Sequence, residues 1–220
     1  MVAAGVDEAG RGPVIGPMVI AGVSISSIKA KKLKSLGVKD SKMLLPERRK
    51  ELASIIREES EFYVIKVVEP RKIDEAVSKS KLNLLEAEVM AEIIKELSPS
   101  LVFVDSPGRN PKRFKELLRS KLSGLNVRIR AENKADRRFV HVAAASILAK
   151  VERDLIIEKL RKEVGYDFGS GYPSDPKTRE FLLRVLDGLS VPEDMIRWKW
   201  ATILNILEEK RRNRITEFLD

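Results

Sequence analysis

The chain has 220 residues, no cysteine and one histidine, and its formal net charge is +9 at pH 7. These counts exclude disulfides, thiolate zinc sites and cysteine nucleophiles, and they argue against imidazole zinc sites and Ser-His-Asp triads. Any metal would be held by oxygen ligands, which favours Mg²⁺ or Mn²⁺. The basic charge favours a polyanionic partner, because lysine and arginine neutralise phosphates. A solvated basic surface would give the same composition.

The length of the chain suffices for one well-packed core, alone or with an appendage. The sequence contains no signal peptide and no transmembrane run. We therefore expect a cytoplasmic protein without membrane association. A monomer is the default expectation for its oligomeric state.

Two adjacent acids follow an apolar start, in the segment Val6-Asp7-Glu8-Ala9-Gly10-Arg11-Gly12-Pro13. This pattern indicates a buried strand whose end emerges into a site. Neighbouring side chains on a strand point to opposite faces, so Asp7 and Glu8 could share an ion only if the backbone leaves extended geometry there. Gly10 and Gly12 would tolerate that departure. Two acids beside a bare backbone and Arg11 suit a metal ion that faces a phosphate.

Apolar runs and helix signals predict alternating strands and helices along the first hundred residues. The β-branched run at 14–25 predicts a strand that forms a hairpin with the first one, interrupted at Gly16-Pro17. Asn83 followed by Glu86 resembles a capping box for a helix that ends near Leu97. The other predicted elements are helices at 28–36, 46–59 and 70–77 and a strand at 62–68.

A polar loop, Lys39-Asp40-Ser41-Lys42, separates the first two predicted helices. Paired lysines around a small hydroxyl could grip a phosphate backbone. A plain connector is the commoner role for such a loop.

A wholly apolar run at 101–104 predicts a central strand, and Asp105 follows it directly. Open α/β sheets bind their ligands at the carboxyl ends of strands, so Asp105 is a candidate third metal ligand. Its alternative role is to cap a turn.

A helix at 111–122 and a strand at 127–130 precede a predicted long helix at 139–164. Asp136 lies just before that helix and could either cap it or supply a fourth carboxylate. Ser146 and Lys150 are four residues apart, so they share a helix face and could contact a phosphate.

The segment 168–176, rich in glycine and proline, is the clearest break in the chain. Tyr172 within it could belong to the core or be presented to a sugar or base. Helices are predicted at 177–186 and 192–210, followed by a charged tail from Arg211 that we expect to fray.

The order of these elements, with acids after the first and fourth strands, resembles the ribonuclease H fold. Seven motifs resemble those of ribonuclease HII of archaeal type, in the family's order from residue 5 to about residue 202. The resemblance implies an α/β fold with a five-stranded mixed sheet flanked by helices at 1–172, and a C-terminal helical region at 173–220. The matching segments lie at 7–13, 39–42, 104–107, 134–136, 143–147, 149–150 and 169–176.

The resemblance also implies the roles of individual residues. The family's metal-binding carboxylates fall on Asp7, Glu8, Asp105 and Asp136, which would hold two divalent ions, Mg²⁺ or Mn²⁺. The element that reads the 2′-hydroxyl and the phosphate falls on Gly10, Arg11 and Gly12, and the tyrosine that stacks on the neighbouring deoxyribose falls on Tyr172. Further candidate substrate contacts are Lys39, Ser41, Lys42, Ser146 and Lys150.

The implied reaction is endonucleolytic cleavage of RNA in RNA–DNA hybrids and of duplex DNA on the 5′ side of an embedded ribonucleotide. The products would carry 3′-hydroxyl and 5′-phosphate ends, and the implied processes are DNA repair and DNA replication. Two other interpretations share part of this evidence. A nuclease or integrase of the same fold could act on DNA alone, and a basic binding module would explain the charge without catalysis.

The C-terminal part departs from the family pattern. Ala201 stands where the family's Arg-x-x-Trp-Lys-Thr motif has lysine, so we assign no substrate role to Arg197 or Trp200. Ile215 and Phe218 have the spacing of a motif that docks on the sliding clamp, but Arg212 replaces its usual glutamine. A frayed tail is the alternative to that clamp contact.

Overall fold

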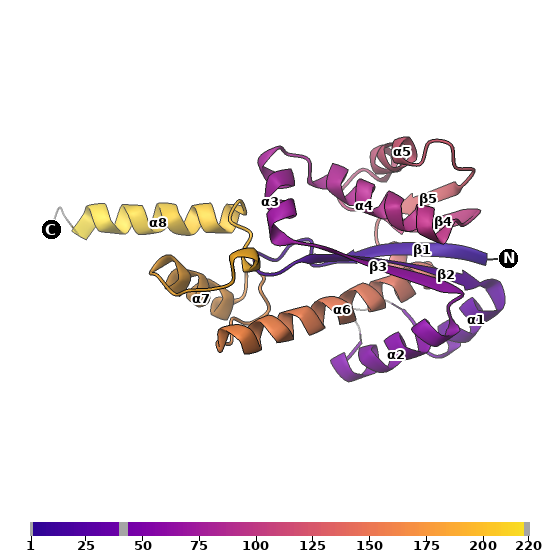
Figure 1. Ribbon diagram of the computed structural model, residues 1–220, viewed down its shortest axis with the longest axis horizontal. Coiled ribbons are helices and arrows are strands. Elements are labelled where there is room, and N and C mark those ends of the chain that lie inside the picture. The colour runs from indigo at the N-terminus through magenta and orange to yellow at the C-terminus, as the bar shows by residue number, and fades with distance from the viewer. Residues whose placement is uncertain (1, 40–43, 218–220) are drawn as a thin grey trace.

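The structure, a computed structural model, describes residues 2–39 and 44–217 (Figure 1). Its centre is a five-stranded mixed sheet with the strand order β3-β2-β1-β4-β5. The first three strands are antiparallel neighbours, and β4 and β5 run parallel to β1. The predicted α/β fold is confirmed. The strands are β1 (Val2–Ala9), β2 (Met18–Ser26), β3 (Phe62–Val68), β4 (Leu101–Asp105) and β5 (Arg128–Glu132).

Helices cover both faces of the sheet (Figure 1). Helices α3, α4 and α5 lie on one face, and α1, α2 and the long α6 lie on the other. The helices on the first face are α3 (Pro70–Ser78), α4 (Leu82–Leu97) and α5 (Pro111–Lys121). Those on the second face are α1 (Ser27–Ser35), α2 (Pro46–Glu59) and α6 (Val140–Val164), with the short 3₁₀ helix η2 (Ala135–Arg137) before α6.

The two faces form separate hydrophobic clusters because successive strand residues point to opposite sides. Met18 and Ile20 pack toward α4, whereas Val19 and Ala21 pack toward α6. Helix α6 approaches β1 so closely that a Cβ at Gly5 would lie 2.1 Å from the carbonyl carbon of His141. Only glycine permits that contact, which brings the residues of α6 to the end of β1.

The parallel pairing of β1 with β4 brings two acid-bearing strand ends together. Val6 is registered with Val104, so the acids that follow them, Asp7 and Asp105, emerge side by side. The carboxyl ends of parallel strands share one sheet edge, as open α/β sheets require for a ligand site.

The C-terminal region contains two helices and a short 3₁₀ helix at one end of the sheet (Figure 1). Its hydrophobic cluster includes Val14, Ile15 and Ile157 from the earlier part of the chain. The domain boundary after residue 172 stays a prediction. Among the described helices, none is long and apolar enough to cross a membrane. The elements are α7 (Pro176–Leu186), η3 (Glu193–Met195) and α8 (Ala201–Glu217).

The sequence placed the start of the second strand too early. Strand β2 begins at Met18, because Gly16 adopts a positive φ of +80° and Pro17 follows it. The two residues before that break bond elsewhere: the amide of Val14 donates to the Gly171 carbonyl at 2.8 Å, and Ile15 forms a bridge with Ile196.

The capping box predicted at Asn83 and Glu86 is wrong. Helix α4 already begins at Leu82, and its N-cap, Lys81, makes no side-chain cap. Both predicted capping residues lie inside the helix and bond to Arg11 instead. A long-range partner has replaced the local one.

The helix predicted at 192–210 is also wrong in its first half. After η3 the chain is extended at Ile196, and α8 begins only at Ala201. Docking overrides helix propensity here, since the Arg197 amide donates to the Val14 carbonyl at 2.9 Å. The helix also ends later than predicted, because α8 continues past Lys210 to Glu217.

Candidate active site

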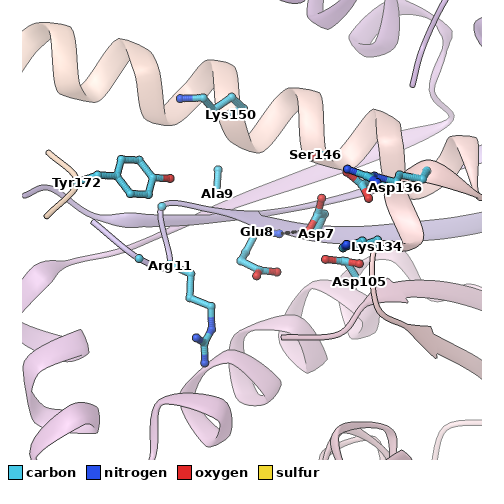
Figure 2. A pocket seen from close by; sticks show the side chains of 13 residues that line it. Asp7, Glu8, Ala9, Arg11, Asp105, Lys134, Asp136, Ser146, Lys150 and Tyr172 are labelled. Atoms are coloured by element: carbon cyan, nitrogen blue, oxygen red, sulfur yellow. Dashed lines mark hydrogen bonds between the residues drawn. The ribbon is translucent and has the colours of Figure 1, made fainter. Parts of the chain in front are cut away.

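Three carboxylates meet at the end of β1. One oxygen from each of Asp7, Glu8 and Asp105 lies within 4.8 Å of the others, and Figure 2 shows the three side chains beside the strand. Strand β1 stays paired with β2 through Ala9. The expectation that the backbone leaves extended geometry at the two acids is therefore wrong. Glutamate has one methylene more than aspartate, and this reach takes the place of a backbone distortion.

The surroundings of these carboxylates disfavour their charged forms. Burial, and then repulsion from Asp105, raises the pKa of Asp7 to about 8, although a hydrogen bond from Ser146 opposes the rise. Burial, followed by repulsion from Asp7 and Glu86, also raises the pKa of Glu8. The Oε2 atom of Glu8 is buried without a hydrogen-bond partner among the described residues. A divalent cation would relieve the repulsion and supply that oxygen with a partner, so the donor set fits a hard metal ion.

Asp105 also fixes the turn that carries the fourth predicted carboxylate. Its Oδ1 atom accepts a hydrogen bond from the Ala135 amide at 2.6 Å, and Asp136 follows in η2. Asp136 lines the same pocket and adds to the rise of the Asp7 pKa, but it lies outside the 4.8 Å cluster. Helix α6 has Phe139 as its N-cap, so Asp136 does not cap it.

The carboxylates line a pocket of about 540 Å³. It is built from the end of β1 and the loop after it, the end of β4, η2, one face of α6 and the loop before α7. Ser146 and Lys150 both project from α6 toward it, as their spacing predicted (Figure 2). The predicted site residues that line this pocket are Asp7, Glu8, Gly10, Arg11, Gly12, Asp105, Asp136, Ser146, Lys150 and Tyr172.

The remaining predicted contacts do not line this pocket. Lys39 lines a neighbouring pocket of about 410 Å³, which shares Asp136 and Arg137 with the first. Ser41 and Lys42 lie outside the described residues, so their predicted contact stays a prediction.

Gly10, Arg11 and Gly12, here called the glycine loop, form the wall of the pocket beyond the carboxylates. Gly10 has a positive φ of +83°, and a Cβ there would lie 2.1 Å from Nε of Arg153. A Cβ at Gly12 would instead meet Cε1 of Tyr172 at 3.6 Å, an ordinary contact distance. Gly10 is therefore needed by the fold, whereas Gly12 keeps the space in front of Tyr172 open.

The side chain of Arg11 runs away from Tyr172 and toward α4 (Figure 2). Its Nε donates to Glu86 at 2.7 Å, and its terminal nitrogen donates to Asn83 at 2.8 Å. Glu86 is fully buried, and burial raises its pKa to about 7 despite the opposing charge of Arg11. The sequence pointed to Arg11 but not to these two partners.

Three side chains hold the glycine loop and its continuation, although the sequence suggested no role for the first and no substrate role for the other two: Arg153, Arg197 and Trp200. Both arginines are almost fully buried. One signal for Arg197 was present in the sequence. It directly follows the apolar pair Met195-Ile196, and apolar neighbours indicate a buried segment, whereas an exposed arginine usually has polar neighbours.

A family model described as Ribonuclease HII matches residues 4–203. Ribonuclease HII from Methanosarcina barkeri is 43% identical over 96% of this chain and 98% of its own length. Ribonuclease H2 from Pyrococcus horikoshii, known from a crystal structure, has 42% sequence identity to this chain. The two structures match with a TM-score of 0.86 over 96% of this chain and 99% of the Pyrococcus chain. Ribonuclease HII from Archaeoglobus fulgidus, solved as a complex with PCNA, is 44% identical, with a TM-score of 0.82 over 91% of this chain and 94% of its own. The chain belongs to the ribonuclease HII family, whose members are endonucleases that act on the RNA of RNA–DNA hybrids.

Proposed function

We propose that this chain cuts duplex DNA on the 5′ side of an embedded ribonucleotide as well as the RNA strand of hybrids, and that it leaves 3′-hydroxyl and 5′-phosphate ends. The observation that carries the proposal is the shared pocket. The carboxylate cluster lines one part of it, and the glycine loop and Tyr172 line the other. A phosphate beside the carboxylates would therefore have its ribose beside the loop.

In this proposal Asp7, Glu8, Asp105 and Asp136 hold two divalent ions, Mg²⁺ or Mn²⁺. Support comes from the three clustered carboxylates and the unpartnered buried oxygen of Glu8. When bound, such ions lower the pKa of an attacking water and stabilise charge on the leaving oxygen. The protein keeps the four carboxylates on rigid strand ends and a short turn, and Ser146 orients Asp7 by a hydrogen bond.

Specificity would come from the ribose 2′-hydroxyl, the group that distinguishes RNA from DNA at a single position. Backbone groups of the glycine loop can reach that hydroxyl without side chains in the way, and Tyr172 faces the loop across the pocket. Lys150 and Ser146 would contact phosphates on the α6 side. Lys39, which lines the neighbouring pocket, would contact the phosphate backbone together with Ser41 and Lys42.

The wider setting follows from the same proposal. A nuclease with this specificity would serve DNA repair and DNA replication, and we expect it in the cytoplasm as a monomer. The C-terminal tail is proposed to contact a sliding clamp, with support from the Archaeoglobus relative solved together with PCNA. Of the two residues that motivate this contact, Phe218 lies outside the described part of the chain.

The test is a DNA duplex with one embedded ribonucleotide, incubated with the protein and Mg²⁺ or Mn²⁺. We expect a single cut on the 5′ side of the ribonucleotide, with ends that a ligase and a phosphatase identify as 3′-hydroxyl and 5′-phosphate. Equal cutting of an all-DNA duplex would favour the DNA-only nuclease. Binding without any cut would favour the non-catalytic module.

A further inference from the structure

The segment between η3 and α8 lies behind the glycine loop, on the side away from the substrate pocket. Ile196 forms a β-bridge with Ile15, and the amide of Arg197 donates to the Val14 carbonyl at 2.9 Å. The pocket lining includes the glycine loop but neither Arg197 nor Trp200. The loop thus separates these two side chains from the substrate.

The Arg197 side chain is fully buried, and each of its hydrogen bonds to the described residues goes to a backbone carbonyl. Its Nε bonds to Gly16 O at 2.9 Å, and its two terminal nitrogens bond to Arg11 O at 3.0 Å and to Gly10 O at 2.6 Å. Trp200 takes the next carbonyl, since its indole Nε1 donates to Gly12 O at 3.1 Å. Every carbonyl of the glycine loop is therefore bound by one of two side chains from the C-terminal region.

This arrangement buries a cation without a carboxylate partner. Among the described side chains none forms an ion pair with Arg197, and burial lowers its pKa to about 9, so it remains protonated at neutral pH. The charge is balanced by carbonyl dipoles, by the Trp200 ring, whose centroid lies 5.0 Å from the guanidinium, and at longer range by the carboxylates of Asp74 and Glu86. An apolar side chain would fill this space at a lower desolvation cost. The charge therefore has a use in orienting the carbonyls.

The direction of the carbonyls determines the direction of the amides. The described chain has no cis peptide bond, and in a trans peptide the N–H points opposite to the C=O of the same unit. The carbonyls of Gly10 and Arg11 point to Arg197, so the amides of Arg11 and Gly12 point away from it. Those two amides face the side on which the pocket lies.

We propose that Arg197 and Trp200 are positioning residues for the glycine loop. Arg197 aims the amides of Arg11 and Gly12 at the ribonucleotide, and Trp200 fixes the end of the loop through Gly12 O, whose peptide unit with Pro13 has no N–H. The C-terminal region then belongs to the recognition of ribose, although it does not line the pocket. This inference rests on the proposed function, because it assumes that the loop reads the 2′-hydroxyl.

The milder variant is Trp200→Phe, which keeps an aromatic ring for packing and removes the N–H donor that fixes the end of the loop at Gly12. One lost hydrogen bond to the loop should raise KM for the duplex with one embedded ribonucleotide roughly three- to tenfold. The inhibition constant of an all-DNA duplex of the same sequence, used as a competitor, should stay within about twofold, because that duplex has no 2′-hydroxyl to read. Mn²⁺ binding should be unchanged. Trp198→Phe, two residues away and exposed, is the matched control.

An unchanged KM in Trp200→Phe, or equal weakening of both duplexes, would overturn the inference. Arg197→Lys tests the aiming of the amides directly, since lysine keeps the charge but has one nitrogen in place of the three separate guanidinium nitrogens that bind the three carbonyls. Arg197→Lys should lower the preference for the ribonucleotide duplex over the all-DNA duplex by more than Trp200→Phe does. A preference in Arg197→Lys that equals or exceeds that of Trp200→Phe would also count against the proposal. If the unmodified protein itself fails to prefer the ribonucleotide duplex, the proposed function has failed, and the two failures are thus distinguishable.

Discussion

The carboxylate cluster and the glycine loop share one pocket but have opposite electrostatic states. In the cluster, Asp7, Glu8 and Asp105 repel one another, and a buried oxygen of Glu8 lacks a partner. In the loop, each carbonyl from Gly10 to Gly12 has a hydrogen-bond donor from the C-terminal region. The first half of the site is incomplete without a cation, whereas the second half is complete before any substrate arrives.

This difference separates what each half contributes to the protein. Clustered like charges destabilise the fold, and the cation that they would bind accounts for their presence. Removal of one of these charges should therefore lower activity without lowering stability. A satisfied, preorganised loop stabilises the fold and also fixes the position of donors before binding. A substitution at Gly10, where the backbone packs against Arg153, should therefore lower the stability of the fold. A substitution at Gly12, which faces the open pocket, should weaken substrate binding instead.

The largest expected effect is on turnover in Asp7→Asn. Loss of one clustered carboxylate should lower kcat by at least about a thousandfold, because metal-ion stabilisation of the transition state is worth several kcal/mol. The fold should persist, since the amide is isosteric and removes a repulsive charge. The rate of cleavage of the ribonucleotide duplex measures turnover, and circular dichroism measures whether the fold persists. Unimpaired cleavage would remove Asp7 from the metal site.

The second prediction concerns stability against pH in the metal-free protein. The pKa of Asp7 is raised to about 8 in the folded state from an ordinary value of 3.8, so between these pH values the folded state holds a proton that the unfolded state has released. Stability should therefore fall as pH rises from about 4 to about 8, by an amount of the order of a few kcal/mol.

Asp7→Asn should lack this pH dependence. The free energy of unfolding of the variant should therefore exceed that of the unmodified protein by an amount that grows across the same pH range. Guanidinium unfolding with a chelator present measures the difference at each pH. Parallel curves for the two proteins would contradict the assigned environment of Asp7. Added Mn²⁺ should restore stability to the unmodified protein and much less to the variant.

The third prediction tests the support beneath the loop. Gly10→Ala places a Cβ at a φ of +83° and 2.1 Å from Nε of Arg153, a buried side chain that is bonded to the carbonyls of Ile15 and Pro17. We expect a loss of about 2–4 kcal/mol in the free energy of unfolding from strain and steric overlap together.

Gly124→Ala is the matched control, because Gly124 has a similar φ of +85° but open space around its Cβ position. It should lose only the strain component, about 1–2 kcal/mol. Equal losses in the two variants would show that Arg153 does not support the loop.

The sequence allowed the carboxylates to be found because their positions follow from local patterns. Asp7 and Asp105 end apolar runs, and parallel strands bring such ends to one edge. The partners of Arg11 could not be found in this way, since Asn83 and Glu86 match a local capping pattern equally well. The sequence matched Arg197 to the family's motif but did not show what it binds. Residues 192–200 were predicted to be helical, and their docking against Val14 keeps them out of a helix. Contacts between segments 180 residues apart leave little local signal.

The smallest effect on the fold is expected in Gly12→Ala, which sharpens the contrast with Gly10. Gly12 does not have a positive φ, and a Cβ would lie 3.6 Å from Cε1 of Tyr172, so the free energy of unfolding should change by less than about 1 kcal/mol. The added methyl group would occupy the space between the loop and Tyr172 in which we propose that the ribose lies. The ribose and the methyl group would then compete for the same space, so KM for the ribonucleotide duplex should rise roughly tenfold. An unchanged KM with unchanged stability would mean that the sugar does not enter between Gly12 and Tyr172, and the ribose-reading half of the pocket would have to lie elsewhere.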